Sequence, residues 1–170
     1  MPNPVHVFVA RHVSTMNASQ PRATHVAVRD GRILGYGDAA DMGAFGPAEW
    51  DDRFAGKVIL PGFVEGHSHT SDAPVTPLAP LFTASCAVNR RSATGRVLGE
   101  AERITVAQAL HAVTLGAAYT LHMDHLVGSI DVGKFADFAV LDEDPAEVDP
   151  AALGDVRARA TVVGGQVFPS

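Results

Sequence analysis

Two histidines separated by one residue, followed closely by an aspartate, are the residues of this sequence best suited to bind a metal. His67 and His69 follow an apolar run, Val58–Leu60, and Asp72 comes three residues after the second histidine. On a strand, positions i and i+2 point to the same side, so both imidazoles can reach one divalent cation. Asp72 could supply a third ligand or a base for an attacking water. This donor set suits zinc, with iron or manganese as alternatives.

A simpler alternative is that His67 and His69 are exposed polar residues at a strand end, because two imidazoles alone do not make a metal site. Three more histidines could add a ligand: His111, His122 and His125. The first lies in a predicted helix and the other two near its end, where surface and helix-dipole roles are common. We therefore treat them as weaker candidates than His67, His69 and Asp72.

The first third of the chain, from Val5 to Leu60, mostly alternates apolar and polar residues, which is typical of half-buried strands. His25–Arg29 and Arg32–Tyr36 flank Asp30-Gly31, a pair that readily takes the positive φ angles of a tight turn, and this predicts a hairpin. The polar stretch from Asp38 to Asp52 predicts a loop with one short helix.

The middle third favours helices. Apolar residues without β-branched enrichment follow Pro77 and predict a short helix over Leu78–Val88. A clearer helix should run from about Val106 to about Leu121, because Thr105 and Gln108 have the spacing of a capping box and an apolar stripe follows them.

The last third returns to strands, Phe138–Leu141, Ala160–Val163 and Gln166–Phe168, with Gly164-Gly165 as a turn. Neither the first nor the last set of strands offers a second layer for its own apolar face. We therefore predict a mainly β fold with some α: a composite β-sandwich built from the N- and C-terminal segments, plus two or so helices.

Length and charge exclude several classes of protein. A complete TIM barrel needs roughly 250 residues, whereas this chain has 170. The net charge of −6 disfavours nucleic acid as a partner, and no apolar run approaches the ~20 residues that span a bilayer. No export signal begins the sequence, and the single cysteine, Cys86, is expected to be a small buried side chain. These features favour a cytoplasmic protein that acts without membrane contact.

Four stretches resemble the metal-dependent amidohydrolase superfamily. Val58–His69 resembles the first barrel strand of that superfamily, and Gly128–Asp142 looks like its return to a small β-sandwich. Ser71–Leu81 and Ala87–Arg91 resemble the segment after barrel strand 8 in the YtcJ-like branch, amidohydrolase family 3. The resemblance implies a hydrolase of non-peptide carbon–nitrogen bonds, such as amides or formamides, that uses a metal-activated water. It implies His67 and His69 as metal ligands and Asp72 as a ligand that also handles the water proton.

The chain also departs from the family pattern, because His69 and Asp72 are three residues apart and barrel strands 2 to 7 are missing. The division we expect is a sandwich from residues 1–60 and 126–170, with 61–125 as a remnant of barrel strands 1 and 8 and the helices that follow them. Glu65 and Gly116 stand where the family often has aspartate and asparagine. The family's other ligands lie in the missing region.

Two functions therefore remain open. In the first, the chain is a zinc-dependent hydrolase of a small amide-like substrate. In the second, it is a catalytically inactive sandwich fragment, with a truncated TIM barrel and without metal. Helices that lack a barrel to pack on should expose apolar stripes, which makes a homo-oligomer a further expectation.

Overall fold

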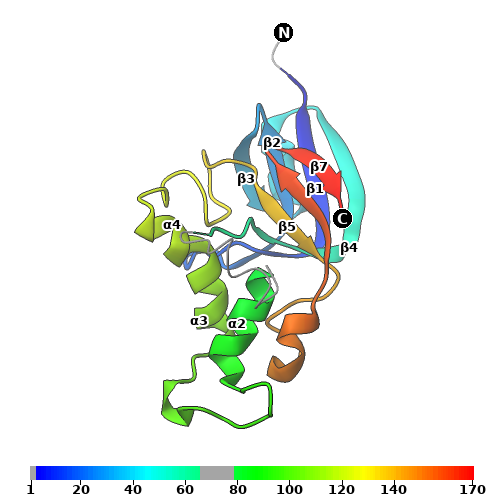
Figure 1. The fold of residues 1–170 in the computed structure, drawn as a ribbon. Coiled ribbons are helices and arrows are strands. Elements are labelled where there is room, and N and C mark those ends of the chain that lie inside the picture. The colour runs from blue at the N-terminus through cyan, green and yellow to red at the C-terminus, as the bar shows by residue number, and fades with distance from the viewer. Residues whose placement is uncertain (1–2, 66–78) are drawn as a thin grey trace.

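The computed structural model describes residues 3–65 and 79–170, and Figure 1 shows a sheet with helices packed at one end of it. Seven strands form one sheet in the order β3-β2-β1-β4-β5-β6-β7. Their bounds are β1 Val5–Ser14, β2 Arg22–Arg29, β3 Arg32–Gly37, β4 Ala48–Pro61, β5 Phe138–Leu141, β6 Ala158–Val163 and β7 Gln166–Pro169. The sheet is not a closed parallel barrel, since among the described strands only β1 and β4 are parallel.

Strand β4 joins the two ends of the chain. It runs parallel to β1 and antiparallel to β5, so Ile59 lies between Val13 on one side and Val140 on the other. Side chains alternate along these strands: Ile59 and Val140 face one core, whereas Leu60 and Leu141 face another. The shared sheet of the two terminal segments, as predicted, therefore depends on β4.

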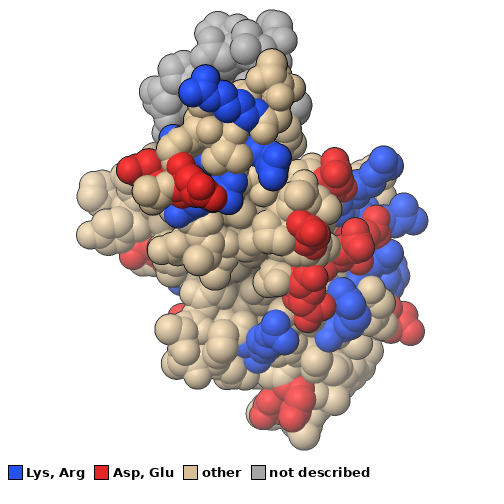
Figure 2. All heavy atoms as spheres, turned by 90° about the horizontal axis from the view of Figure 1, so that it is seen from below, with Lys and Arg blue, Asp and Glu red and all other residues tan. Residues whose placement is uncertain are grey.

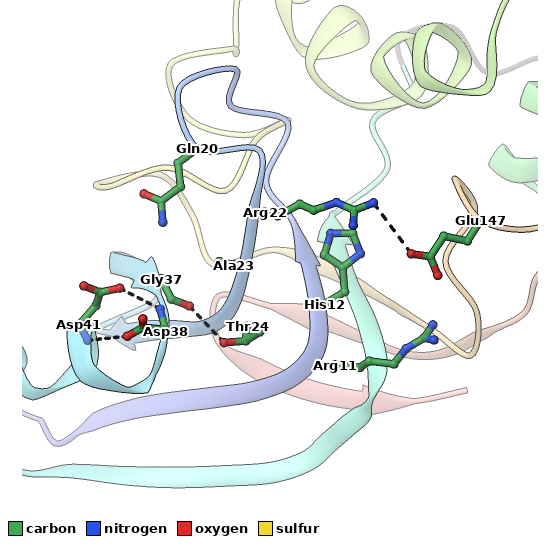
Figure 3. A pocket seen from close by; sticks show the side chains of 10 residues that line it. All are labelled: Arg11, His12, Gln20, Arg22, Ala23, Thr24, Gly37, Asp38, Asp41 and Glu147. Atoms are coloured by element: carbon green, nitrogen blue, oxygen red, sulfur yellow. Dashed lines mark hydrogen bonds and ion pairs between the residues drawn. The ribbon is translucent and has the colours of Figure 1, made fainter.

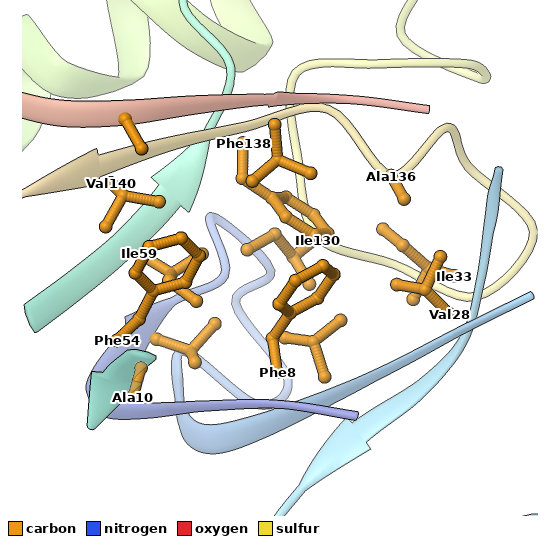
Figure 4. Close-up of a cluster of buried hydrophobic side chains, with 14 residues drawn as sticks. Phe8, Ala10, Val28, Ile33, Phe54, Ile59, Ile130, Ala136, Phe138 and Val140 are labelled. Carbon is orange, nitrogen blue, oxygen red and sulfur yellow. The ribbon is translucent and has the colours of Figure 1, made fainter. Parts of the chain in front are cut away.

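The main core lies between the two halves of the sheet, which fold over each other (Figure 4). Phe8 from β1 contacts Phe54 from β4 and meets Phe138 from β5 edge to face, each with 6.1 Å between ring centroids. These aromatic contacts join strands from both ends of the chain, and the predicted composite sandwich is confirmed.

The predicted hairpin is confirmed, whereas the predicted loop after it is partly wrong. Asp30 and Gly31 connect β2 and β3 with φ angles of 52° and 74°. After them, α1 (Ala39–Met42) and the 3-10 turn η1 (Gly43–Phe45) match the expected short helix. Residues 48–52, however, already belong to β4, because they pair with β1 despite their charged side chains.

Both longer predicted helices are present. Helix α2 spans Pro80–Asn89, and the second helix comprises α3 (Val106–His111), the π-helical turn η4 (Ala112–Gly116) and α4 (Ala117–Thr120). Thr105 and Gln108 form the predicted capping box, in which each side chain accepts from the other residue's backbone N–H. The π turn was not predicted from the sequence.

The helices cover the outer face of β4 and β5. Leu81 and Leu110 pack there against Leu60 and Leu141, together with Leu153 of the 3-10 helix η5 (Pro150–Asp155). A further 3-10 turn, η3 (Glu100–Glu102), connects the two longer helices. No helix in residues 3–65 or 79–170 has both the length and the apolar character needed to cross a membrane.

The expectation for Cys86 is wrong, because its thiol is exposed. Helix α2 turns Leu81, Ala84 and Val88 toward the core. At about 100° per residue, position 86 points away from that face. Apolar sequence neighbours therefore did not determine the environment of this side chain.

Candidate functional site

The strand that leads to the predicted metal ligands is firmly held. Val58, Ile59 and Leu60 of β4 are fully buried. Beyond the strand, the Gly62 N–H donates to the Asp137 carbonyl at 2.8 Å, and the Val64 N–H donates to the Val113 carbonyl at 3.0 Å. The chain is thus fixed against both the C-terminal segment and the second helix shortly before it reaches His67.

His67, His69 and Asp72 lie outside the described residues, so their predicted roles stay predictions. Within the described ranges, no group of three or more His, Cys, Asp or Glu side chains could hold a metal ion. His111, His122 and His125 are exposed and do not form such a group.

A hollow of about 720 Å³ lies beside Glu65, just before the predicted ligands in the sequence. His111, Gly116, Thr120 and Leu121 also line it. A Cβ atom at Gly116 would stand only 3.2 Å from His111 Nδ1, so a larger residue there would require the imidazole to shift. The size of the residue at position 116 therefore affects where the His111 side chain can lie.

The most unusual polar contact in the described chain joins His12 and Asp144. His12 Nδ1 lies 2.5 Å from Asp144 Oδ2, and the two side chains are only 13% and 2% exposed. Asp144 Oδ1 also accepts from the Ala146 N–H at 2.9 Å. The other ring nitrogen, His12 Nε2, is buried and has no partner among the described residues. An unpaired buried polar atom of this kind typically costs about 1–3 kcal/mol.

No pattern in the sequence indicated this pair. His12 lies in an alternating strand, and Asp144 belongs to an acidic run that predicts only a turn after β5. The two residues are 132 positions apart. Only the folding of the N-terminal strand against the C-terminal segment brings them together.

Two further contacts join oppositely charged side chains of the N-terminal segment and of the turn after β5. Lys57 Nζ donates to Asp142 at 2.6 Å, and this hydrogen bond lowers the pKa of the Asp142 carboxyl. Arg22 and Glu147 approach to 3.9 Å. Figure 2 shows acidic and basic side chains intermingled on the face seen there rather than separated into patches of one sign.

Lys134 holds together the stretch that precedes β5. Its ammonium group donates to the carbonyls of Asp124 and Val127 and to Ser129 Oγ. Burial lowers the pKa of Lys134, while the nearby carboxylates of Asp131 and Asp124 oppose that shift. Since the amine satisfies several backbone oxygens, we assign it a structural role.

A comparison with models of protein families shows to which family the chain belongs. The model of a family described as "Amidohydrolase family" matches residues 70–169, which is more than half of the chain. This chain belongs to the amidohydrolase family.

Curated relatives of this amidohydrolase chain are much longer than it is. The YtcJ amidohydrolase of Bacillus subtilis (strain 168) is 37% identical over 100 residues, which cover 57% of this chain and 19% of that protein. The N-substituted formamide deformylase of Arthrobacter pascens is 32% identical over 98 residues, which cover 58% of this chain and 18% of the deformylase. The chain thus spans about a fifth of the length of these relatives.

Solved structures support the fold of the amidohydrolase chain. An adenosine deaminase from Xanthomonas campestris, crystallised with bound zinc, has a TM-score of 0.62 at 12% identity; the match covers 98% of this chain and 93% of that one. A protein described as a prolidase from Bifidobacterium longum has a TM-score of 0.63 at 12% identity, with 99% and 95% covered. At these identities the similarity shows the fold alone.

Proposed function

We propose that this amidohydrolase chain binds a divalent metal through His67 and His69 and serves the hydrolysis of non-peptide carbon–nitrogen bonds. The observation that carries the proposal is that the chain is held in place up to Val64, three residues before His67 in the sequence, in a member of the amidohydrolase family. A rigid element gives the residues that follow it a fixed starting point, which a free loop does not.

The donor set fits the metal. Two imidazoles and a carboxylate suit zinc, iron or manganese. When bound, the metal supplies Lewis acidity that polarises the substrate carbonyl. Asp72 takes the proton of the attacking water and later returns it to the leaving amine. The hollow beside Glu65 and His111 has the volume of a small-molecule site, which supports an amide-sized substrate.

Formamides are the substrate class we favour. The support is the similarity to the N-substituted formamide deformylase of Arthrobacter pascens, although only about a fifth of that protein is matched. Within the proposal, the chain acts on the small formyl or acyl carbonyl, and the groups that select the rest of the substrate are left unassigned.

A second candidate function is a scaffold without catalysis. One observation favours it: the seven strands described, which come from both ends of the chain, enclose a hydrophobic core of their own. In this alternative, the histidines at 67 and 69 are retained from a longer ancestor.

Metal content separates the two candidates. The chain is purified without added metal, and metal per chain is measured by mass spectrometry for the wild type, His67→Ala/His69→Ala and a control, His6→Ala. The control removes an imidazole from an exposed position that is not among the candidate ligands. The hydrolase proposal expects near one equivalent in wild type and control and none in the first variant. Absence of metal from the wild type would exclude the hydrolase proposal and favour the scaffold function.

Activity is then tested with formamide substrates on the metal-loaded chain and on Asp72→Asn. If Asp72 moves the proton, the variant loses hydrolysis and still contains metal, because the asparagine oxygen remains a donor. A wild type that binds metal but hydrolyses no formamide would contradict the substrate class while leaving the metal site standing.

A further inference from the structure

A cavity of about 470 Å³ lies between β1, β2 and the start of α1, away from the predicted metal ligands in the sequence (Figure 3). Its side chains include Arg11, His12, Arg22, Asp38 and Asp41. A volume of this size is typical of small-molecule sites.

Cations gather on one side of the cavity. Figure 3 shows Arg11, His12 and Arg22 together on this side, beside Glu147. Arg11 is exposed and makes no ion pair or hydrogen bond that involves a described residue. Arg22 is held only by the 3.9 Å contact with Glu147, and both of these side chains are more than half exposed. Both guanidinium groups can therefore turn toward a ligand.

Anions gather on the opposite side, where Asp38 and Asp41 begin α1. Asp38 accepts from the backbone N–H groups of Ala40 and Asp41, and Asp41 accepts from the Asp38 N–H. These bonds fix the two carboxylates in place without neutralising their charge. Thr24 and Gly37 connect the two sides along the wall of the cavity.

The buried histidine adds an independent observation. Among the described residues, His12 Nε2 is the buried side-chain atom without a hydrogen-bond partner, and it belongs to a residue that lines this cavity. Asp144 fixes the ring by its contact with Nδ1, so the imidazole is a rigid part of the cavity wall beside Arg11 and Arg22.

We propose that this cavity binds a small zwitterion, with its carboxylate at Arg11 and Arg22 and its ammonium group at Asp38 and Asp41. The separation of charge determines the ligand class. A simple anion would have to face the two aspartates as well, and a simple cation would have to face the two arginines. A molecule with both charges satisfies both sides.

The test uses the isotope-labelled full chain and a series of linear amino acids, from glycine through 4-aminobutyrate to 6-aminohexanoate. Backbone amide signals of Arg22 and Thr24 are followed by NMR during titration. We expect saturable shifts that favour a limited range of lengths, because the two carboxylates are held at the start of α1 and the strands β1 and β2 hold the backbones of the two arginines. Butyrate and butylamine, which carry one charge each, should bind about tenfold more weakly or worse.

Variants locate the two ends of the ligand. Arg11→Ala/Arg22→Ala removes the cationic side, and Asp38→Asn/Asp41→Asn removes the anionic charges while keeping the oxygen acceptors that cap α1. Each of these two variants should weaken binding of the preferred amino acid about tenfold or more, whereas Arg91→Ala/Arg96→Ala, at exposed positions outside the cavity, should not.

Circular dichroism first establishes that each variant is folded. Shifts that do not saturate would overturn the proposal, as would equal binding of the zwitterion and the singly charged compounds. Unchanged binding in either charge-removing variant would also overturn it.

Discussion

At the scale of single residues, Asp144 is an unusual carboxylate because it is almost fully buried and has two distinct donors. One is the ring of His12, from the opposite end of the chain, and the other is the Ala146 N–H in its own turn. A charged group can remain buried only when such bonds replace water. Its removal should therefore affect the fold more than the loss of an exposed acid.

We expect Asp144→Ala to lower the free energy of unfolding by about 1–3 kcal/mol, because the His12 ring and the Ala146 N–H lose their part-buried acceptor. Urea denaturation measures the change. The control is Glu143→Ala at the neighbouring exposed position, where the effect should stay within about 0.5 kcal/mol. Equal losses in both variants would show that the buried pair does not stabilise the fold.

His25 provides a pH-dependent prediction. Burial lowers its pKa below the ordinary 6.5, although the carboxylate of Asp38 acts in the opposite direction. The Trp50 ring packs edge to face against the imidazole, with 5.6 Å between centroids. As the pH falls below 6.5, the unfolded chain takes up this proton before the folded chain does. The contribution of neutral His25 to stability is therefore present above that pH and lost on acidification.

Two measurements check this. Proton NMR of the imidazole should give a titration midpoint for His25 below 6.5. The urea midpoint of the wild type should fall more steeply between about pH 7 and the folded pKa than that of His25→Gln. A midpoint at or above 6.5 would contradict the burial argument.

The residues of the candidate sites differ in how far the sequence could reveal them. His67 and His69 form a local pattern, which a reader of the sequence can recognise. His12 and Asp144 could not be found in this way, because their contact depends on the pairing of β4 with both β1 and β5. A local sequence pattern can indicate candidate metal ligands. The cavity beside α1 could not be predicted in this way, because its lining residues come from several elements.

At the scale of elements, the capping box at the start of α3 is the clearest local signal. Thr105→Ala removes the oxygen that accepts from the Gln108 N–H, so we expect a loss of about 0.5–2 kcal/mol of stability. The measurement is thermal or urea unfolding followed at 222 nm. Thr120→Ala is the matched control, because Thr120 donates only to carbonyls within its own helix. That variant should be neutral or slightly more stable.

Local alternation was enough to predict most strands and the hairpin, since each of these depends on neighbouring residues. The start of β4 was missed because its charged residues, Glu49, Asp51 and Asp52, suggest a loop. They are in a strand because β1 supplies a parallel partner about forty residues away in the sequence. Parallel strands are not joined by a tight turn, so no turn residues in the sequence indicate that they pair.

At the scale of the whole molecule, the two ends of the chain share one core, and Phe138 lies where they meet. Phe138→Ala should cost about 3–5 kcal/mol, because it opens a cavity beside Phe8. The same substitution at Phe168, which is 53% exposed on β7, should cost much less. Urea unfolding of the two variants compares them directly; similar losses would mean that the shared core is not what holds the sheet together.

The apolar residues beyond the sheet bear on self-association. Tyr119 is 69% exposed at the end of the second helix, and Leu121 and Met123 follow it. The homo-oligomer expected from the sequence remains a prediction, and sedimentation of the full chain at several concentrations would test it.

The position of β4 also sets an order of events during synthesis. Ile59 and Leu60 leave the ribosome about eighty residues before Val140 and Ala139, their partners across the sheet. At roughly 5–20 residues per second, this strand waits about 4–16 seconds with one edge unpaired. The nascent chain therefore offers the apolar end of β4, Val58–Leu60, to chaperones throughout that interval. The N-terminal segment cannot complete its own core before the last third of the protein has been made.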